Sequence, residues 1–109
     1  MLKRIRREVP ATSRNVWEII GYDSVTRIFL AEIPVGLITT EKLHELLRVL
    51  VAKHGGLTDE EIVGSLLKRG TRRHLVHLDV HPGNDDVRRT TTYKCGENPH
   101  FVARLREAS

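Results

Sequence analysis

Histidines and a single cysteine are the residues of this sequence whose types and spacing could do chemistry. His77 and His81 flank Asp79 in an alternating stretch, Cys95 ends the next one, and His100 follows a turn. Imidazole and thiolate groups bind transition metals when three or four of them converge at bonding distance. The candidate metal ligands are therefore His77, His81, Cys95 and His100. Because no two cysteines stand two residues apart, as in a typical zinc site, these histidines are expected on a solvated strand face.

Cys95 could instead act as a nucleophile. A catalytic thiol needs a lowered pKa and an adjacent base, which His74 or His100 could supply. A chain with six histidines offers such pairs by chance, and a lone cysteine at the end of a strand is most often a small core residue. A thiol- or metal-dependent activity centred on Cys95 is therefore an alternative only. No catalytic residue is assigned, no cofactor is expected, and a non-enzymatic function is favoured.

Basic residues form two short clusters that bracket a mildly acidic middle. The chain has 18 Lys and Arg against 14 Asp and Glu, a net charge of +4. Such uneven placement indicates a nucleic acid or an acidic partner. The candidate binding residues are Lys3, Arg4, Arg6 and Arg7 in the first cluster and Lys68, Arg69, Arg72 and Arg73 in the second.

The second cluster lies between a predicted helix pair and a predicted hairpin. That order of elements resembles a winged helix-turn-helix, in which the N-terminal residues of the reading helix approach the DNA. Here that end is Asp59, Glu60 and Glu61, whose carboxylates would repel phosphates. The nucleic-acid alternative is therefore a non-specific grip on phosphates through the two basic clusters.

Hydrophobic patterning predicts the elements that must position these residues. Two runs rich in β-branched and aromatic residues, at 16–20 and 26–33, flank turn-forming residues at 21–24. This pattern predicts an antiparallel hairpin. The second run is apolar on both faces, which predicts a central strand or a strand at an oligomer contact. Apolar residues then recur at helical spacing over 40–53, and Gly55-Gly56 ends this helix.

A second helix is predicted to begin at Thr58. Thr58 and Glu61 form a capping box, and Lys68 and Arg69 complement the C-terminal dipole before a stop at Gly70. The buried stripe of this helix is predicted to be Ile62, Val63, Leu66 and Leu67. Alternation then predicts strands over 74–81, 87–95 and 100–106, joined by turns at 82–86 and 96–99.

The element order β-β-α-α-β-β-β predicts an α+β fold. It is a two-layer domain with an antiparallel sheet of about five strands and two helices on one face. Residues 15–109 form the single domain, and residues 1–14 are a basic N-terminal arm and a candidate for flexibility. One cysteine and no stretch of signal-peptide or membrane-spanning length predict a cytoplasmic protein with no membrane partner.

A small protein-interaction module is the function that these observations favour: a regulator, inhibitor or assembly subunit. Strong catalytic motifs are missing from the sequence, and the run at 26–33 adds apolar surface that a two-layer domain of this size could leave uncovered. We therefore expect a protein partner or self-association, including a homodimer. Nucleic-acid binding through the basic clusters is the first alternative.

Overall fold

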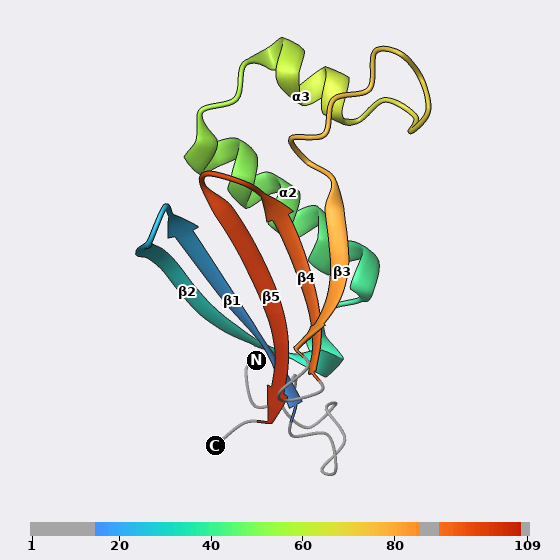
Figure 1. The fold of residues 1–109 in the computed structure, drawn as a ribbon. Helices are drawn as coiled ribbons and strands as arrows, with labels where there is room; N and C mark the ends of the chain where they lie inside the picture. Colours follow the sequence, from blue (N-terminus) through green and yellow to red (C-terminus); the bar gives the residue numbers. More distant parts are fainter. Residues whose placement is uncertain (1–14, 86–89, 108–109) are drawn as a thin grey trace.

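The computed structural model describes residues 15–85 and 90–107 (Figure 1). Its elements are β1 Asn15–Asp23, β2 Thr26–Pro34, the short 3-10 helix η1 Val35–Leu37, α2 Thr40–Gly55, α3 Asp59–Ser65, β3 Val80–Asp85, β4 Thr90–Gly96 and β5 His100–Glu107. The predicted α+β class, the five-stranded antiparallel sheet, the two helices and their order are confirmed. The predicted N-terminal arm, with Lys3, Arg4, Arg6 and Arg7, lies outside the described residues.

The strands are arranged in the order β2-β1-β5-β4-β3, with every neighbouring pair antiparallel. The predicted β1–β2 hairpin is confirmed, but its turn is only Ser24-Val25, because strand pairing continues to Asp23 and Thr26. The prediction of β2 as a central strand is wrong. β5 pairs with the other side of β1, so β2 occupies the edge of the sheet.

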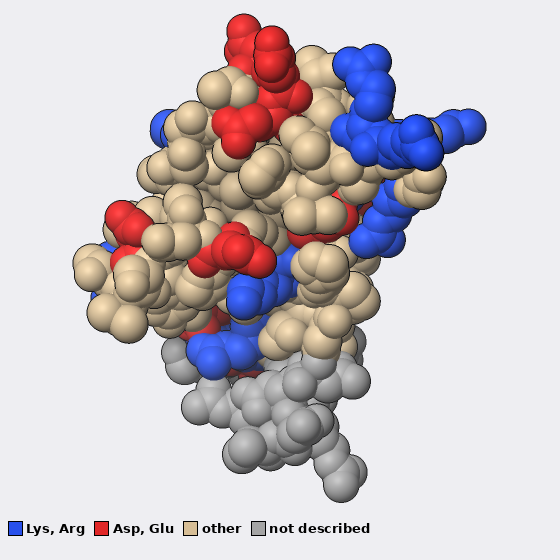
Figure 2. Space-filling view, turned by 45° about the horizontal axis from the view of Figure 1, so that its top comes forward, with Lys and Arg blue, Asp and Glu red and all other residues tan. Residues whose placement is uncertain are grey.

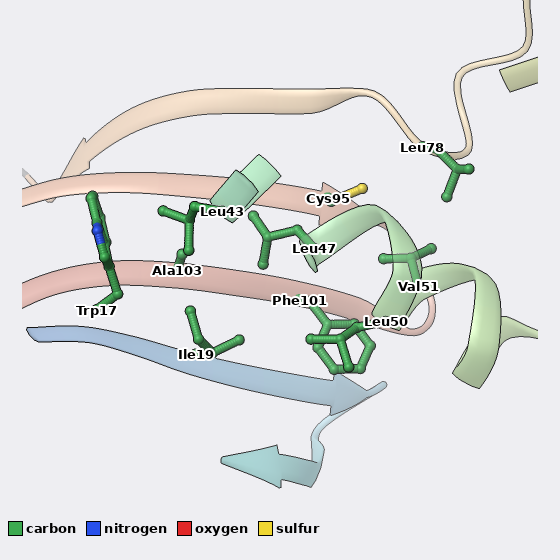
Figure 3. Packing of buried hydrophobic residues seen from close by; sticks show 10 residues of the cluster. All are labelled: Trp17, Ile19, Leu43, Leu47, Leu50, Val51, Leu78, Cys95, Phe101 and Ala103. Atoms are coloured by element: carbon green, nitrogen blue, oxygen red, sulfur yellow. The ribbon is translucent and has the colours of Figure 1, made fainter. Parts of the chain in front are cut away.

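Helix α2 covers one face of the sheet and forms the core with it (Figure 3). Thr39 caps its first turn by accepting a hydrogen bond from the Lys42 amide at 3.2 Å, and Gly56 ends it in the left-handed conformation, with φ 62°. The helix packs against β3, β4 and β5. The core residues, all buried, are Trp17, Ile19, Leu43, Leu47, Leu50, Val51, Leu78, Cys95, Phe101 and Ala103.

The centre of this core depends on a close approach between β1 and an aromatic ring. Phe101 of β5 is fully buried and pairs with Gly21 of β1. A Cβ atom added to Gly21 would lie 2.3 Å from the Phe101 ring. Glycine is therefore the residue that lets the ring lie directly over the β1 backbone.

Helix α3 begins as predicted but ends early. The capping box is confirmed: the Thr58 hydroxyl accepts from the Glu61 amide at 3.2 Å, and Glu61 accepts from the Thr58 amide at 3.0 Å. The helix stops at Ser65. The next amides bond three residues back instead of four: the Leu66 amide donates to the Val63 carbonyl at 3.1 Å and the Leu67 amide to the Gly64 carbonyl at 3.4 Å. The chain then folds back, and the Leu75 amide also donates to the Gly64 carbonyl, at 3.0 Å.

The early end of α3 corrects two predictions. Val63 and Leu66 are exposed, so the predicted buried stripe is wrong at these two positions, whereas Ile62 packs against the core and Leu67 is partly buried. Lys68 and Arg69 follow the helix instead of forming its last turn, so they do not complement its dipole as predicted. Neither helix in the described part of the chain has the length and apolarity needed to cross a membrane.

Of the predicted strand over 74–81, only the last two residues, Val80 and His81, form a strand. Strand β3 begins at Val80, which pairs with Cys95, and it continues through the predicted turn to Asp85. Residues 66–79 form a connecting segment of turns between α3 and β3. The reason is that β4 ends at Gly96, so residues before Val80 find no strand partner among the described residues.

The face of the sheet opposite α2 carries a network of ion pairs. Glu18 of β1 lies between Arg104 and Arg106 of β5, with Glu18 Oε2 3.0 Å from Arg106 Nε, and Arg106 also contacts Glu32 of β2. The Glu18 side chain is only 14% exposed. Burial raises the pKa of Glu18, but the hydrogen bonds and charges of Arg104 and Arg106 outweigh it, so the pKa falls below its usual 4.5.

We expect Glu18→Gln to lower the free energy of unfolding at pH 7 by about 1–2 kcal/mol, because it removes a charged partner of two arginines. A depressed carboxyl pKa contributes stability above the unfolded-state pKa, and this is lost as pH falls through the folded-state pKa. The difference between wild type and variant should therefore shrink as the pH falls below 4.5. Urea unfolding across this pH range measures it.

The matched control is Glu45→Gln, which removes an exposed carboxylate 3.1 Å from Lys42. It should change the unfolding free energy by less than about 0.5 kcal/mol. An equal loss for Glu18→Gln at pH 7 and pH 3 would contradict the assignment of this stability to the ionised carboxylate.

Candidate functional site

Two clefts lie on either side of the connecting segment 66–79, and Asp79 lines both. The larger, of 620 Å³, is bounded by the end of α2, the start of β3 and the β4–β5 turn. We name it the histidine cleft after His77 and His81, which line it with Lys94 and Glu97. The smaller, of 440 Å³, lies between α2 and the connecting segment. We name it the arginine cleft after two arginines described below.

The structure brings together two of the four predicted metal ligands. His77 and His81 both line the histidine cleft, with His77 Nε2 3.5 Å from Glu61 Oε2. Cys95 is buried in the core, and His100 stacks on Tyr22 with ring centroids 5.3 Å apart. Within residues 15–85 and 90–107, no three His, Cys, Asp or Glu side chains are grouped as a metal site requires.

The thiol of Cys95 is in an environment unsuited to nucleophilic chemistry. It is fully buried among core residues. Burial raises its pKa from 9.0 to about 11; the charge of Arg48 lowers the pKa and the charge of Asp79 raises it. Because a nucleophilic cysteine must ionise near neutral pH, this geometry gives no support to an activity centred on Cys95.

Ser65, His74 and Asp79 line the arginine cleft together and are the residue types of a hydrolase triad. Their hydrogen bonds do not form one. His74 Nδ1 lies 2.7 Å from the Leu67 carbonyl, and its Nε2 lies 2.9 Å from Asp79 Oδ1. The Ser65 hydroxyl donates to the Glu61 carbonyl at 2.7 Å. Both imidazole nitrogens are engaged elsewhere, so His74 cannot take a proton from Ser65.

His74 and Asp79 instead clamp the connecting segment closed. Their side chains are only 10% and 11% exposed. Both His74 nitrogens lie within hydrogen-bond distance of an oxygen, one of the Leu67 carbonyl and one of the Asp79 carboxylate. The clamp joins Leu67, just beyond α3, to the residue before β3. The alternating pattern of residues 74–81 predicted a regular strand, and residues 74–79 form turns instead, which is what lets Asp79 reach His74.

The second basic cluster is exposed on the connecting segment. Its residues are Lys68, Arg69, Arg72 and Arg73. Figure 2 shows Lys and Arg side chains gathered at the corner of the molecule formed by the segment after α3, and acidic side chains over the start of α3. Arg69 Nη2 lies 3.8 Å from Asp79 Oδ2. The cluster is thus anchored at one residue to the clamp and is otherwise exposed.

Two residues of α2 complete the arginine cleft. Arg48 lines it with Arg69, and its Nε donates to the Leu78 carbonyl at 3.1 Å. His44 lines it too, and its ring packs edge-on against Tyr93 with centroids 4.5 Å apart. Both residues lie off the apolar stripe of the helix predicted over 40–53, where a helical side chain is expected to face solvent. No local signal could reveal them, because the segment that covers them, residues 66–79, lies far along the chain from α2.

The native Cys95 thiol should react slowly with a disulfide reagent such as DTNB. At pH 8, a thiol with a pKa of about 11 has roughly 100-fold less thiolate than one with a pKa of 9.0. Burial also slows the access of the reagent to the thiol. The rate of colour development in native buffer, compared with that in 6 M guanidinium chloride, tests this. Equal rates for native and unfolded protein would show that the thiol is exposed.

Asp79→Asn and His74→Gln should each lower the free energy of unfolding by about 1–3 kcal/mol, because each leaves a buried partner incompletely bonded. Amide hydrogen exchange over residues 66–79 should accelerate in both variants. His77→Gln, on the exposed side of the same segment, is the matched control. If the double variant loses the full sum of the two single losses, the residues do not act as a pair.

No known protein family, curated protein or solved structure matches this chain. Its function must therefore be inferred from its own geometry. The features able to contact another molecule are the two clefts beside residues 66–79, the exposed basic cluster and the edge strand β2.

Proposed function

We propose that this protein is a small, non-enzymatic interaction module that binds a protein partner by strand pairing along the outer edge of β2. In this mode, an extended segment of the partner adds a strand to an exposed sheet edge through main-chain hydrogen bonds. The position of β2 at the end of the strand order carries the proposal. Within residues 15–85 and 90–107, no strand pairs with its outer side.

The two edges of the sheet differ in how readily they could accept another strand. β3 is six residues long and contains Pro82, which has no amide hydrogen to donate. Proline and short length are ways in which natural sheets prevent edge pairing. β2 is nine residues long, and its only proline is the last residue, Pro34. The backbone of β2 therefore offers the longer and less protected edge.

The side chains of β2 also favour a protein partner. Phe29, Ala31 and Ile33 pack against the core, but Ile28 and Leu30 are 39% and 50% exposed. Full burial of an Ile or Leu side chain contributes about 1.5–3 kcal/mol. A partner strand that covers these two residues would gain hydrophobic contact in addition to backbone hydrogen bonds. This explains why a strand at the edge is apolar on both faces.

The clefts give less support to an enzymatic function than the edge of β2 gives to partner binding. Cys95 is buried with a raised pKa, and both nitrogens of His74 are engaged in the clamp. Among the described residues, no nucleophile lies beside a base that is able to activate it.

We expect the double variant Ile28→Lys, Leu30→Lys to lose the partner, because lysines on an edge strand oppose pairing. Tagged wild type and variant would be purified from the native cell and their co-purifying proteins quantified by mass spectrometry. Sedimentation of the pure protein would show whether the partner is a second copy. Circular dichroism would verify that the variant is folded.

Val49→Lys is the matched control, since Val49 is an exposed apolar residue on α2, away from the edge. It should retain the partner. Equal recovery of the same partners with the β2 double variant and with Val49→Lys would refute strand pairing at β2.

A further inference from the structure

We infer that the arginine cleft binds a small organic phosphate, whose phosphate group is held by Arg48 and Arg69. This site is separate from the edge of β2 and does not depend on the proposed strand pairing. The cleft has a volume of 440 Å³, within the range of small-molecule sites. Its walls come from α2 on one side and from the connecting segment and the start of β3 on the other.

Two guanidinium groups from different elements provide the positive charge. Only Nε of Arg48 donates a hydrogen bond within the described residues, so its Nη groups keep their donors for a ligand. Arg69 makes a single long contact of 3.8 Å with Asp79, and its side chain is 71% exposed. The planar guanidinium fork matches two phosphate oxygens at once, which makes arginine well suited to phosphate recognition.

The acid that lines the cleft does not cancel this charge. Asp79 is the one carboxylate among the lining residues and lies 2.9 Å from His74 Nε2. With two arginines against one paired carboxylate, the cleft has net positive charge even when both histidines are neutral. Lys68, Arg72 and Arg73, exposed on the same segment, add to the field that attracts an anion.

His44 adds a second observation that points to a ligand. Its Nε2 is buried and has no hydrogen-bond partner within the described residues. Buried polar atoms are nearly always paired, so one left alone beside a cleft indicates a missing partner.

The remaining lining residues indicate that the phosphate is attached to an apolar group. Leu66, Leu67, Leu78 and Val80 line the cleft beside the arginines. Leu66 is exposed and would be covered by a bound ligand. A phosphate ester with an aromatic or aliphatic body therefore matches the cleft better than inorganic phosphate does.

Isothermal titration calorimetry with phenyl phosphate, at low ionic strength, tests this inference. We expect binding that weakens at least tenfold in Arg69→Ala, whose exposed side chain can be removed without disturbing the core. Arg48→Lys keeps the charge but loses the fork, so it should also weaken binding. The matched control is Arg27→Ala, which removes an exposed arginine of β2 and changes the net charge by the same amount. This variant should bind phenyl phosphate as tightly as wild type does. Inorganic phosphate should bind more weakly than phenyl phosphate.

Three results would overturn the inference. The first is no heat of binding for phenyl phosphate at millimolar concentration. The second is equal affinity of Arg69→Ala and Arg27→Ala for phenyl phosphate. The third comes from a 12-base-pair DNA duplex in the same buffer. If DNA binds more tightly than phenyl phosphate, and binding falls with salt and with Arg72→Ala and Arg73→Ala, the cluster binds phosphodiester backbones instead.

Discussion

A single long helix must cover a five-stranded sheet, and it covers only part of it. Leu43, Leu47, Leu50 and Val51 of α2 form its buried stripe, and the helix packs on β3, β4 and β5. Figure 1 shows α3 beyond the end of the sheet instead of beside α2 over its remaining strands. β2 lies at the margin of the sheet, where Phe29, Ala31 and Ile33 face the core and Ile28 and Leu30 are exposed on the face opposite α2. The clefts beside α2 arise because α3 does not pack over the sheet.

Two polar clusters fix the geometry around this core. Glu18 with its two arginines ties the central strands together on the face opposite α2, and the His74–Asp79 pair closes the connecting segment. Partly buried ion pairs bear a desolvation cost, so their main effect is on the position of the groups that they join. The clamp matters for the arginine cleft in this way, because it holds the segment that bears Arg69 beside Arg48 of α2.

Local signals in the sequence predicted much of the fold. The β1–β2 hairpin, the amphipathic stripe of α2 and the capping box at Thr58 depend on neighbouring residues, and all three are confirmed. The edge position of β2 could not be predicted in the same way. It depends on the pairing of β1 with β5, which lie about 80 residues apart in the sequence. A strand that is apolar on both faces has the same pattern whether its second neighbour is present or missing.

The candidate site was less predictable for the same reason. The basic cluster could be predicted from its local charge pattern. Arg48 and His44 could not, because only the return of the chain at Leu75 places the connecting segment over α2. The contact of Asp79 with His74 was also not predicted, because the alternating pattern of residues 74–81 is typical of a strand. The Leu67 carbonyl and Asp79 both bond His74, and these contacts form only when residues 66–79 fold into turns.

Photo-crosslinking in the native cell tests the docking edge most directly. A benzophenone amino acid would replace Leu30 on β2 and, in a separate protein, Val49 on α2; both positions are exposed. Strand pairing at β2 predicts a discrete covalent adduct with one partner protein from position 30 and no such adduct from position 49. The same adduct from both positions, or none from position 30, would contradict it.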